Sequence, residues 1–106
     1  MPYIDYRGVQ LEVDEDGFIV DPSVWNEDLA RFMAESVEGI TELTPDHWKV
    51  IHYINDYYKR FGLAPMIRKL CKDTGFQLKY IYQLFPSGPA KGACKVAGLP
   101  KPAGCV

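Results

Sequence analysis

The sequence predicts a mainly α-helical α+β fold, in which an N-terminal β-hairpin packs on a small helical bundle. Three observations lead to this fold class. The first positions alternate apolar and polar residues, later segments carry apolar residues at three- and four-residue spacing, and glycine or proline ends each helical segment. The chain has 106 residues, 47% of them hydrophobic, which is enough for one core and too little for two.

The N-terminal segment predicts strands. Tyr3–Tyr6 and Val9–Val13 alternate apolar and polar side chains, and the Arg-Gly pair between them fits a two-residue hairpin turn. The acidic segment Asp14–Gly17 predicts a second turn before a further strand at Phe18–Val20. Because this turn lacks the spacing and closing glutamate of a calcium loop, we interpret it as a solvent-exposed turn. A lone hairpin is marginally stable, so this one is expected to pack on the helices.

Two helices are expected next. Asn26 is a suitable N-cap for a helix that runs to about Glu38 and ends at Gly39. Thr44 caps the longest helix, which has proline at its first position and ends at Gly62. The predicted core stripe of this longest helix consists of Trp48, Ile51, Ile54, Tyr58 and Phe61.

Three shorter helices complete the predicted bundle. Ala64–Thr74 predicts the third helix, and the turn at Gly75 joins it to a fourth in a helix-turn-helix or winged-helix-like core. Pro89–Ala97 predicts a fifth helix that carries Cys94, with Gly98 as its C′ residue. The apolar stripe of the fourth helix, which proline ends at position 86, consists of Leu78, Ile81, Tyr82 and Phe85.

The C-terminal segment predicts a mobile arm. Beyond Gly98 no periodicity continues, and Pro100 and Pro102 block a helix. We therefore expect a single globular domain over residues 1–97 and a flexible arm over residues 98–106, with Cys105 near its end. The N-terminus lacks the features of a signal peptide and no run is long enough for a membrane span, so a cytoplasmic location is expected.

Three cysteines in such a chain argue against a disulfide framework. Cys71 lies in a helical pattern and is interpreted as a small buried hydrophobe. Cys94 and Cys105 are eleven positions apart and match no zinc pattern. His47 and His52 are five apart, which places them on different sides of a helix. Metal binding is therefore disfavoured, and redox or sulfur chemistry remains.

Charge is unevenly distributed along the chain. All 14 acidic residues lie within residues 1–73, whereas residues 74–106 carry four lysines and no acid. Lys91, Lys95 and Lys101 lie close in sequence to the two thiols of the C-terminal segment. Nearby cations favour the thiolate and attract an anionic substrate or an acidic partner surface, so these lysines are predicted to give electrostatic support.

The sequence distinguishes three classes of function. A DNA-binding protein is disfavoured, because the candidate recognition helix Gln77–Phe85 offers no arginine and the isoelectric point is about 5.6. A docking subunit whose tail only fills a groove leaves the two thiols unexplained. A thiol carrier gives both thiols a role. The arm from Gly98 to Cys105 extends at most about 25 Å, which suits delivery of Cys105 into a buried site on another protein. If the arm folds back, Cys105 can act as the attacking or sulfur-accepting thiol and Cys94 as the resolving thiol.

The tail closely resembles the DsrC family, also described as the gamma subunit of dissimilatory sulfite reductase. Leu84–Lys95 and Ala97–Val106 carry the resemblance, which covers nearly the whole chain. The related TusE sulfur relay proteins typically lack the upstream cysteine, so Cys94 favours the DsrC branch. The short connection Lys72–Gly75 is more like the sulfite-reducing members than the sulfur oxidisers. Further blocks that match the family are Val13–Phe18, Trp25, Thr44–His47 and Tyr57–Pro65.

The resemblance implies a sulfur carrier that is not catalytic alone. It implies that the arm enters a cleft of the catalytic subunits of sulfite reductase, where Cys105 accepts sulfur and a trisulfide then links it to Cys94. A membrane-bound thiol–disulfide reductase complex would return the thiols and release sulfide. Sirohaem and iron–sulfur clusters belong to the partner, and no cofactor or metal is expected in this chain. Sulfurtransferase partners, the direction of sulfur flow and a dimer linked through Cys105 are left open.

Overall fold

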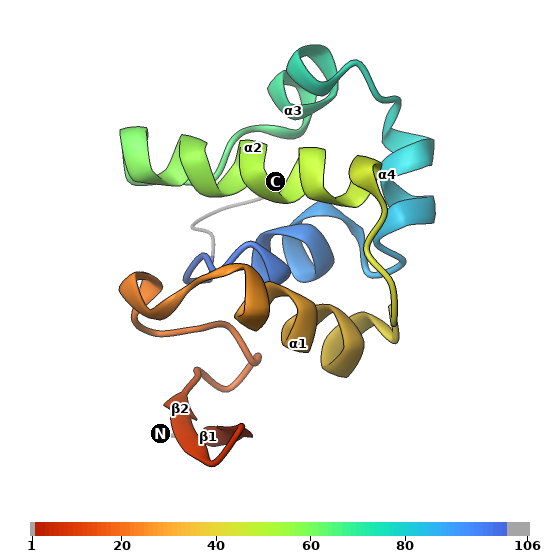
Figure 1. The fold of residues 1–106 in the computed structure, drawn as a ribbon. Coiled ribbons are helices and arrows are strands. Elements are labelled where there is room, and N and C mark those ends of the chain that lie inside the picture. Colours follow the sequence, from red (N-terminus) through yellow and green to blue (C-terminus); the bar gives the residue numbers. More distant parts are fainter. Residues whose placement is uncertain (1, 102–106) are drawn as a thin grey trace.

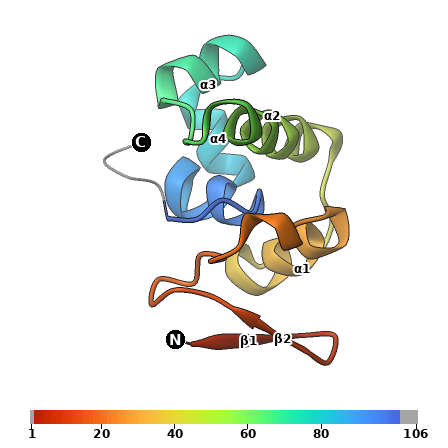
Figure 2. The same cartoon turned by 90° about the vertical axis from the view of Figure 1, so that its left-hand side faces the viewer.

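The computed structural model describes residues 2–101, and within this range the predicted fold class is confirmed. The antiparallel strands β1 (Tyr3–Tyr6) and β2 (Val9–Glu12) form a hairpin below the helical body in Figures 1 and 2. The turn residues Arg7 and Gly8 have φ values of 52° and 85°, as the predicted two-residue turn requires. The Tyr6 ring meets the Phe32 ring edge-on at 5.1 Å between centroids, which attaches the hairpin to the first helix.

The strand predicted at Phe18–Val20 is wrong, because only an isolated bridge between Val13 and Ile19 forms there. The Asp14 carboxylate accepts hydrogen bonds from the backbone N–H groups of Asp16 and Phe18, both at 2.9 Å. These bonds hold the acidic segment in the predicted turn, but the chain after it pairs with the preceding strand only at Ile19.

The two long helices begin and end as predicted. A 3₁₀ turn, η1 (Pro22–Val24), leads into α1 (Glu27–Glu38), and α2 (Pro45–Phe61) follows. Ile51 and Ile54 are fully buried, but Phe61 is 55% exposed, so the predicted core stripe is wrong at its last position. The final turn of α2 extends past the core and leaves the Phe61 ring at the surface.

The helices α3 (Ile67–Thr74) and α4 (Leu78–Leu84) form the predicted helix-turn-helix. The start predicted at Ala64 is wrong by three residues, because a residue that precedes a proline disfavours helical dihedrals. Leu78 is 38% exposed and Tyr82 is 48% exposed, so neither residue of the predicted stripe lies in the core. Phe85 is fully buried but lies beyond α4, as its C-cap residue. None of the described helices has the length and apolar character needed to cross a bilayer.

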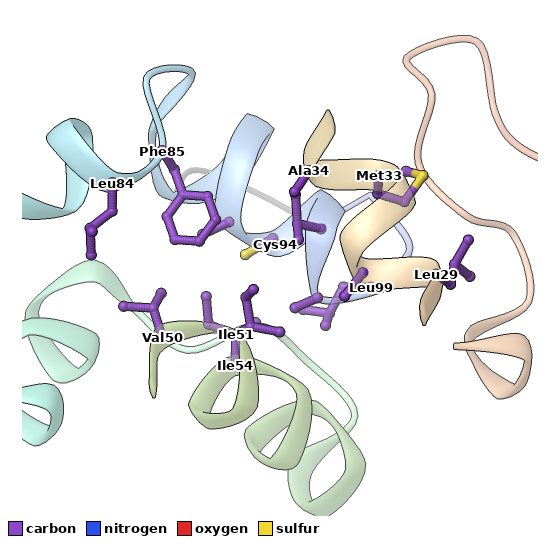
Figure 3. Packing of buried hydrophobic residues seen from close by; sticks show 14 of the residues in the cluster. Leu29, Met33, Ala34, Val50, Ile51, Ile54, Leu84, Phe85, Cys94 and Leu99 are labelled. Atoms are coloured by element: carbon purple, nitrogen blue, oxygen red, sulfur yellow. The ribbon is translucent and has the colours of Figure 1, made fainter. Parts of the chain in front are cut away.

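The predicted fifth helix is a π-helix, η2 (Pro89–Cys94), whose helical backbone continues to Val96. Figure 1 shows this blue segment between α1 and α2, and residues from all three elements form the buried cluster in Figure 3. Gly98 is confirmed as the C′ residue, with φ of 82°. The N–H of Gly98 donates to Lys95 O and that of Leu99 donates to Cys94 O, both at 3.1 Å, which is a Schellman motif.

Candidate functional site

Cys94 ends η2 in the middle of the core. The residue is 2% exposed, and Figure 3 shows its side chain directed toward α2, between Phe85 and Ile51. Burial raises the pKa of the Cys94 thiol to about 12, because the surrounding apolar side chains do not solvate a thiolate. Burial is the cause of this shift, so within the fold Cys94 favours the neutral thiol, and electrostatic support from the lysines stays a prediction.

Two of the three lysines predicted to support the thiols, Lys95 and Lys101, contact the acidic turn. Lys95 Nζ donates to the backbone oxygen of Asp16 at 2.7 Å and lies 4.8 Å from the centroid of the Phe18 ring. Lys101 Nζ donates to Asp16 Oδ2 at 2.6 Å, and Lys91 is exposed. These contacts connect the end of the globular part to a turn some 80 residues earlier. The sequence signal for this contact was an acidic triplet, Asp14–Asp16, together with a C-terminal segment in which lysines are the only charged side chains.

Replacing Lys101 by Gln is expected to raise the pKa of Asp16. The hydrogen bond and charge of Lys101 hold the pKa of that carboxyl below 3.8, its usual value, and Asp16 in turn raises the pKa of Lys101. The ion pair is thus fully formed above the usual carboxyl pKa and is lost as the pH falls through the lowered one. A carboxyl NMR titration of both proteins checks this, with Lys79→Gln on α4 as the control. Equal midpoints in wild type and Lys101→Gln contradict the assignment.

Trp25 and Asn55 hold the turn after Cys94. The sequence did not indicate a role for either side chain. The indole Nε1–H of Trp25 donates to Val96 O at 3.0 Å, and Nδ2–H of Asn55 donates to Ala97 O at 2.9 Å. Asn55 is only 5% exposed although it is polar. A polar residue beside the apolar stripe of α2 was the available signal, but its partner is 42 residues away and is invisible in the sequence.

The first two residues of the predicted arm pack with the globular part. Leu99 is 1% exposed and belongs to the core cluster, and Gly98 lies against the ring of Trp25. Cys105 lies outside the described residues, as does the rest of the predicted arm from residue 102 onward. The division into a domain and an arm, and the role of Cys105, therefore stay predictions.

The other candidate side chains have structural contacts. Cys71 is partly buried and packs against the core, as expected. His47 bonds through Nδ1 to Thr44 Oγ1 at 2.8 Å and through Nε2 to Leu84 O at 3.0 Å. Within residues 2–101, no group of three or more His, Cys, Asp or Glu side chains is arranged to hold a metal ion. A pocket of about 310 Å³ lies at α2 and α3 and is lined by Tyr53, Asp56, Tyr57, Arg60, Phe61, Lys69 and Asp73, none of them a predicted site residue.

Known proteins resemble this chain over its whole length. Residues 5–106 match the family described as DsrC-like protein. The chain is 55% identical, over all of both chains, to the gamma subunit of dissimilatory-type sulfite reductase from Nitratidesulfovibrio vulgaris. It is 42% identical to the sulfurtransferase TusE of Escherichia coli, covering 95% of this chain and 97% of that protein. The crystal structure of the oxidised gamma subunit from Archaeoglobus fulgidus superimposes with a TM-score of 0.86 at 46% identity, over 99% of this chain and 100% of that one.

Proposed function

The chain belongs to the DsrC family of sulfur carriers, and from this membership we propose that it accepts sulfur from a dissimilatory sulfite reductase on Cys105. Cys94 then bridges to that sulfur, and the product is a trisulfide within one chain. Reduction of the trisulfide by a membrane-bound thiol–disulfide reductase complex returns both thiols and releases sulfide. Lys91, Lys95 and Lys101 give the C-terminal segment the positive charge that attracts an acidic partner.

The observation that carries this proposal is the position of Cys94. Among the described residues it ends the last helical element, five residues before Leu99, the last of them to lie in the core, and the family match continues through Cys105. A thiol at this point is close to where the C-terminal segment leaves the core. A second thiol eleven residues later can return to it, because the intervening residues need only reverse direction.

The proposed bridge balances in atoms and electrons. Sulfite gives up its oxygens as water, and its sulfur is reduced by electrons from the reductase together with those of the two thiols. Each cysteine loses its hydrogen and forms one bond to the transferred sulfur. Reduction of both sulfur–sulfur bonds then regenerates two thiols and hydrogen sulfide. This chain therefore acts as a co-substrate whose cysteines are consumed and restored.

The burial of Cys94 supports an order for these steps. A buried neutral thiol with a pKa of about 12 is a poor nucleophile at neutral pH. Cys105 is therefore the thiol that loads first, and Cys94 reacts only after it becomes accessible to the loaded arm.

The test is intact mass spectrometry after incubation with sulfite, an electron donor and the catalytic subunits of sulfite reductase. We expect a species ~30 Da heavier than the dithiol protein, from one sulfur gained and two hydrogens lost. It should be absent from Cys94→Ala and from Cys105→Ala, whereas Cys71→Ala should still form it. Formation of the same species in both tail variants would show that the assignment is wrong.

A second candidate is a sulfur relay of the kind named for TusE, which the 42% identity favours. In a relay a persulfide on Cys105 passes directly to the next carrier, and Cys94 is dispensable. Transfer that survives in Cys94→Ala and fails in Cys105→Ala would select the relay over the trisulfide carrier.

A further inference from the structure

The segment Cys94–Leu99, called the arm-base turn below, begins at the buried Cys94 and packs into the core beside it. Its residues are buried except for Lys95, whose exposure is intermediate. Cys94 packs against α2 and Phe85 on one side, as Figure 3 shows, while Leu99 fills the adjoining part of the core. Solvent or a second thiol can reach Cys94 only if part of this packing opens. The arm-base turn is the part nearest to the predicted arm.

The arm-base turn is held by donors from two distant parts of the chain. Trp25 precedes α1 and donates to Val96 O, while Asn55 lies on α2 and donates to Ala97 O. Val96 and Ala97 both have no exposed surface, and their carbonyls lie at a helix end, where the regular i to i+4 partners run out. Buried carbonyls without a donor are costly, so these two side chains stabilise the closed turn specifically.

These hydrogen bonds are broken when the arm-base turn opens, since the donors remain on the helical body. Trp25 contributes packing as well, because its ring lies where any side chain at Gly98 would have to be. Asn55 is buried in an apolar environment, where a polar side chain is favourable only while it keeps its partner. Both residues therefore act on the equilibrium between the closed and open turn through the carbonyls of Val96 and Ala97.

We propose that Trp25 and Asn55 are positioning residues that hold the arm-base turn closed over Cys94 and so set how long Cys105 stays loaded before Cys94 reacts with it. The second half of this statement rests on the proposed function. The first half concerns this chain alone and can be measured without any partner. The device gives the carrier time to leave its donor, because the resolving thiol becomes available only when the turn opens.

The first test measures alkylation of Cys94 by iodoacetamide in the full-length protein over a series of urea concentrations. Local opening gives a rate that hardly changes with urea, whereas global unfolding gives a rate that rises steeply with it. In Trp25→Phe, which keeps a ring and loses the N–H donor, the urea-independent rate should rise about 3- to 10-fold. Asn55→Leu should act in the same direction. The rate at Cys71, measured in the same samples, should stay constant.

The matched control is Trp48→Phe, which alters the other tryptophan. Trp48 stacks on His52 with 5.4 Å between ring centroids and is in the same core region, but it bonds to no carbonyl of the arm-base turn. Its urea-independent rate at Cys94 should equal that of wild type. A purely structural role for Trp25 would raise only the urea-dependent rate, and would raise it at Cys71 as well. That result overturns the proposal, and so does a urea-independent alkylation rate at Cys94 that is the same in Trp25→Phe and Asn55→Leu as in wild type.

The second test times the reaction between the two cysteines. Oxidised glutathione reacts with the Cys105 thiolate, forming a mixed disulfide and releasing one glutathione thiolate. The Cys94 thiolate then attacks the Cys105 sulfur, forms the internal disulfide and expels the second glutathione, which takes up a proton. Trp25→Phe should release this second glutathione about 3- to 10-fold faster than wild type and Trp48→Phe.

The two proposals fail in different ways. If sulfite reductase never loads the protein but Trp25→Phe still speeds the alkylation of Cys94 and the release of glutathione, the positioning role is supported and the proposed sulfur transfer is wrong. If sulfite reductase loads the protein and Trp25→Phe releases glutathione at the wild-type rate, the positioning role is wrong and the carrier function is still supported.

Discussion

Replacing Gly98 by Ala is expected to destabilise the protein by about 2–5 kcal/mol. Gly98 has φ of 82°, and a left-handed backbone costs other residues about 1–2 kcal/mol. In addition, a Cβ there would lie 2.2 Å from Cδ1 and 2.5 Å from Cγ of Trp25, far closer than two carbons can approach. The ring cannot move away freely, because its N–H is bonded to Val96 O. Overpacking of this kind adds about 1–3 kcal/mol.

Urea unfolding of wild type, Gly98→Ala and Gly39→Ala separates the two contributions. Gly39 ends α1 with φ of 70°, and a Cβ at this position would meet no atom of residues 2–101 within 4 Å, so Gly39→Ala reports the backbone cost alone. Gly98→Ala should lose about 1–3 kcal/mol more than Gly39→Ala. Equal losses would mean that the Trp25 contact does not constrain the arm-base turn.

Raising the pH from about 8 to about 10.5 is expected to remove about 2 kcal/mol of stability through Cys94 alone. Burial raises the pKa of this thiol from 9.0 to about 12 in the folded state. Above the ordinary pKa the unfolded chain loses a proton that the folded chain retains, so ionisation favours unfolding. The contribution is fully present below about pH 9 and is lost progressively as the pH rises toward the folded pKa.

Other groups also titrate at alkaline pH, so the quantity to compare is the change in unfolding free energy for wild type minus that for Cys94→Ala. Cys94→Ala lacks the thiol and should lose about 2 kcal/mol less over the same interval. Parallel curves for wild type and Cys94→Ala would mean that the Cys94 thiol ionises normally in the folded protein.

Local signals in the sequence were sufficient for most of the helix boundaries. Asn26, Thr44 and the glycines at positions 39, 62 and 75 act within one turn of their own helix, and the structure confirms each as a cap. The Schellman turn at Gly98 follows from the same local logic. The predicted boundary at Ala64 was wrong because Pro65 disfavours helical dihedrals at the residue before it. Phe61, Leu78 and Tyr82 were misplaced because periodicity marks a face of a helix but not where the core along that face ends.

Some properties of the site also follow from the sequence, whereas others depend on the tertiary structure. The sequence alone determined that two cysteines flank a short Gly- and Pro-containing segment, and that the family is that of sulfur carriers. Only the tertiary structure decided that Cys94 is a buried neutral thiol, since its pKa depends on which side chains surround it and not on the lysines beside it in the chain. It also brought Trp25 and Asn55 to the carbonyls of Val96 and Ala97, contacts that span 71 and 42 residues. Contacts of that span form when separate helices pack, and no local pattern in the sequence records them.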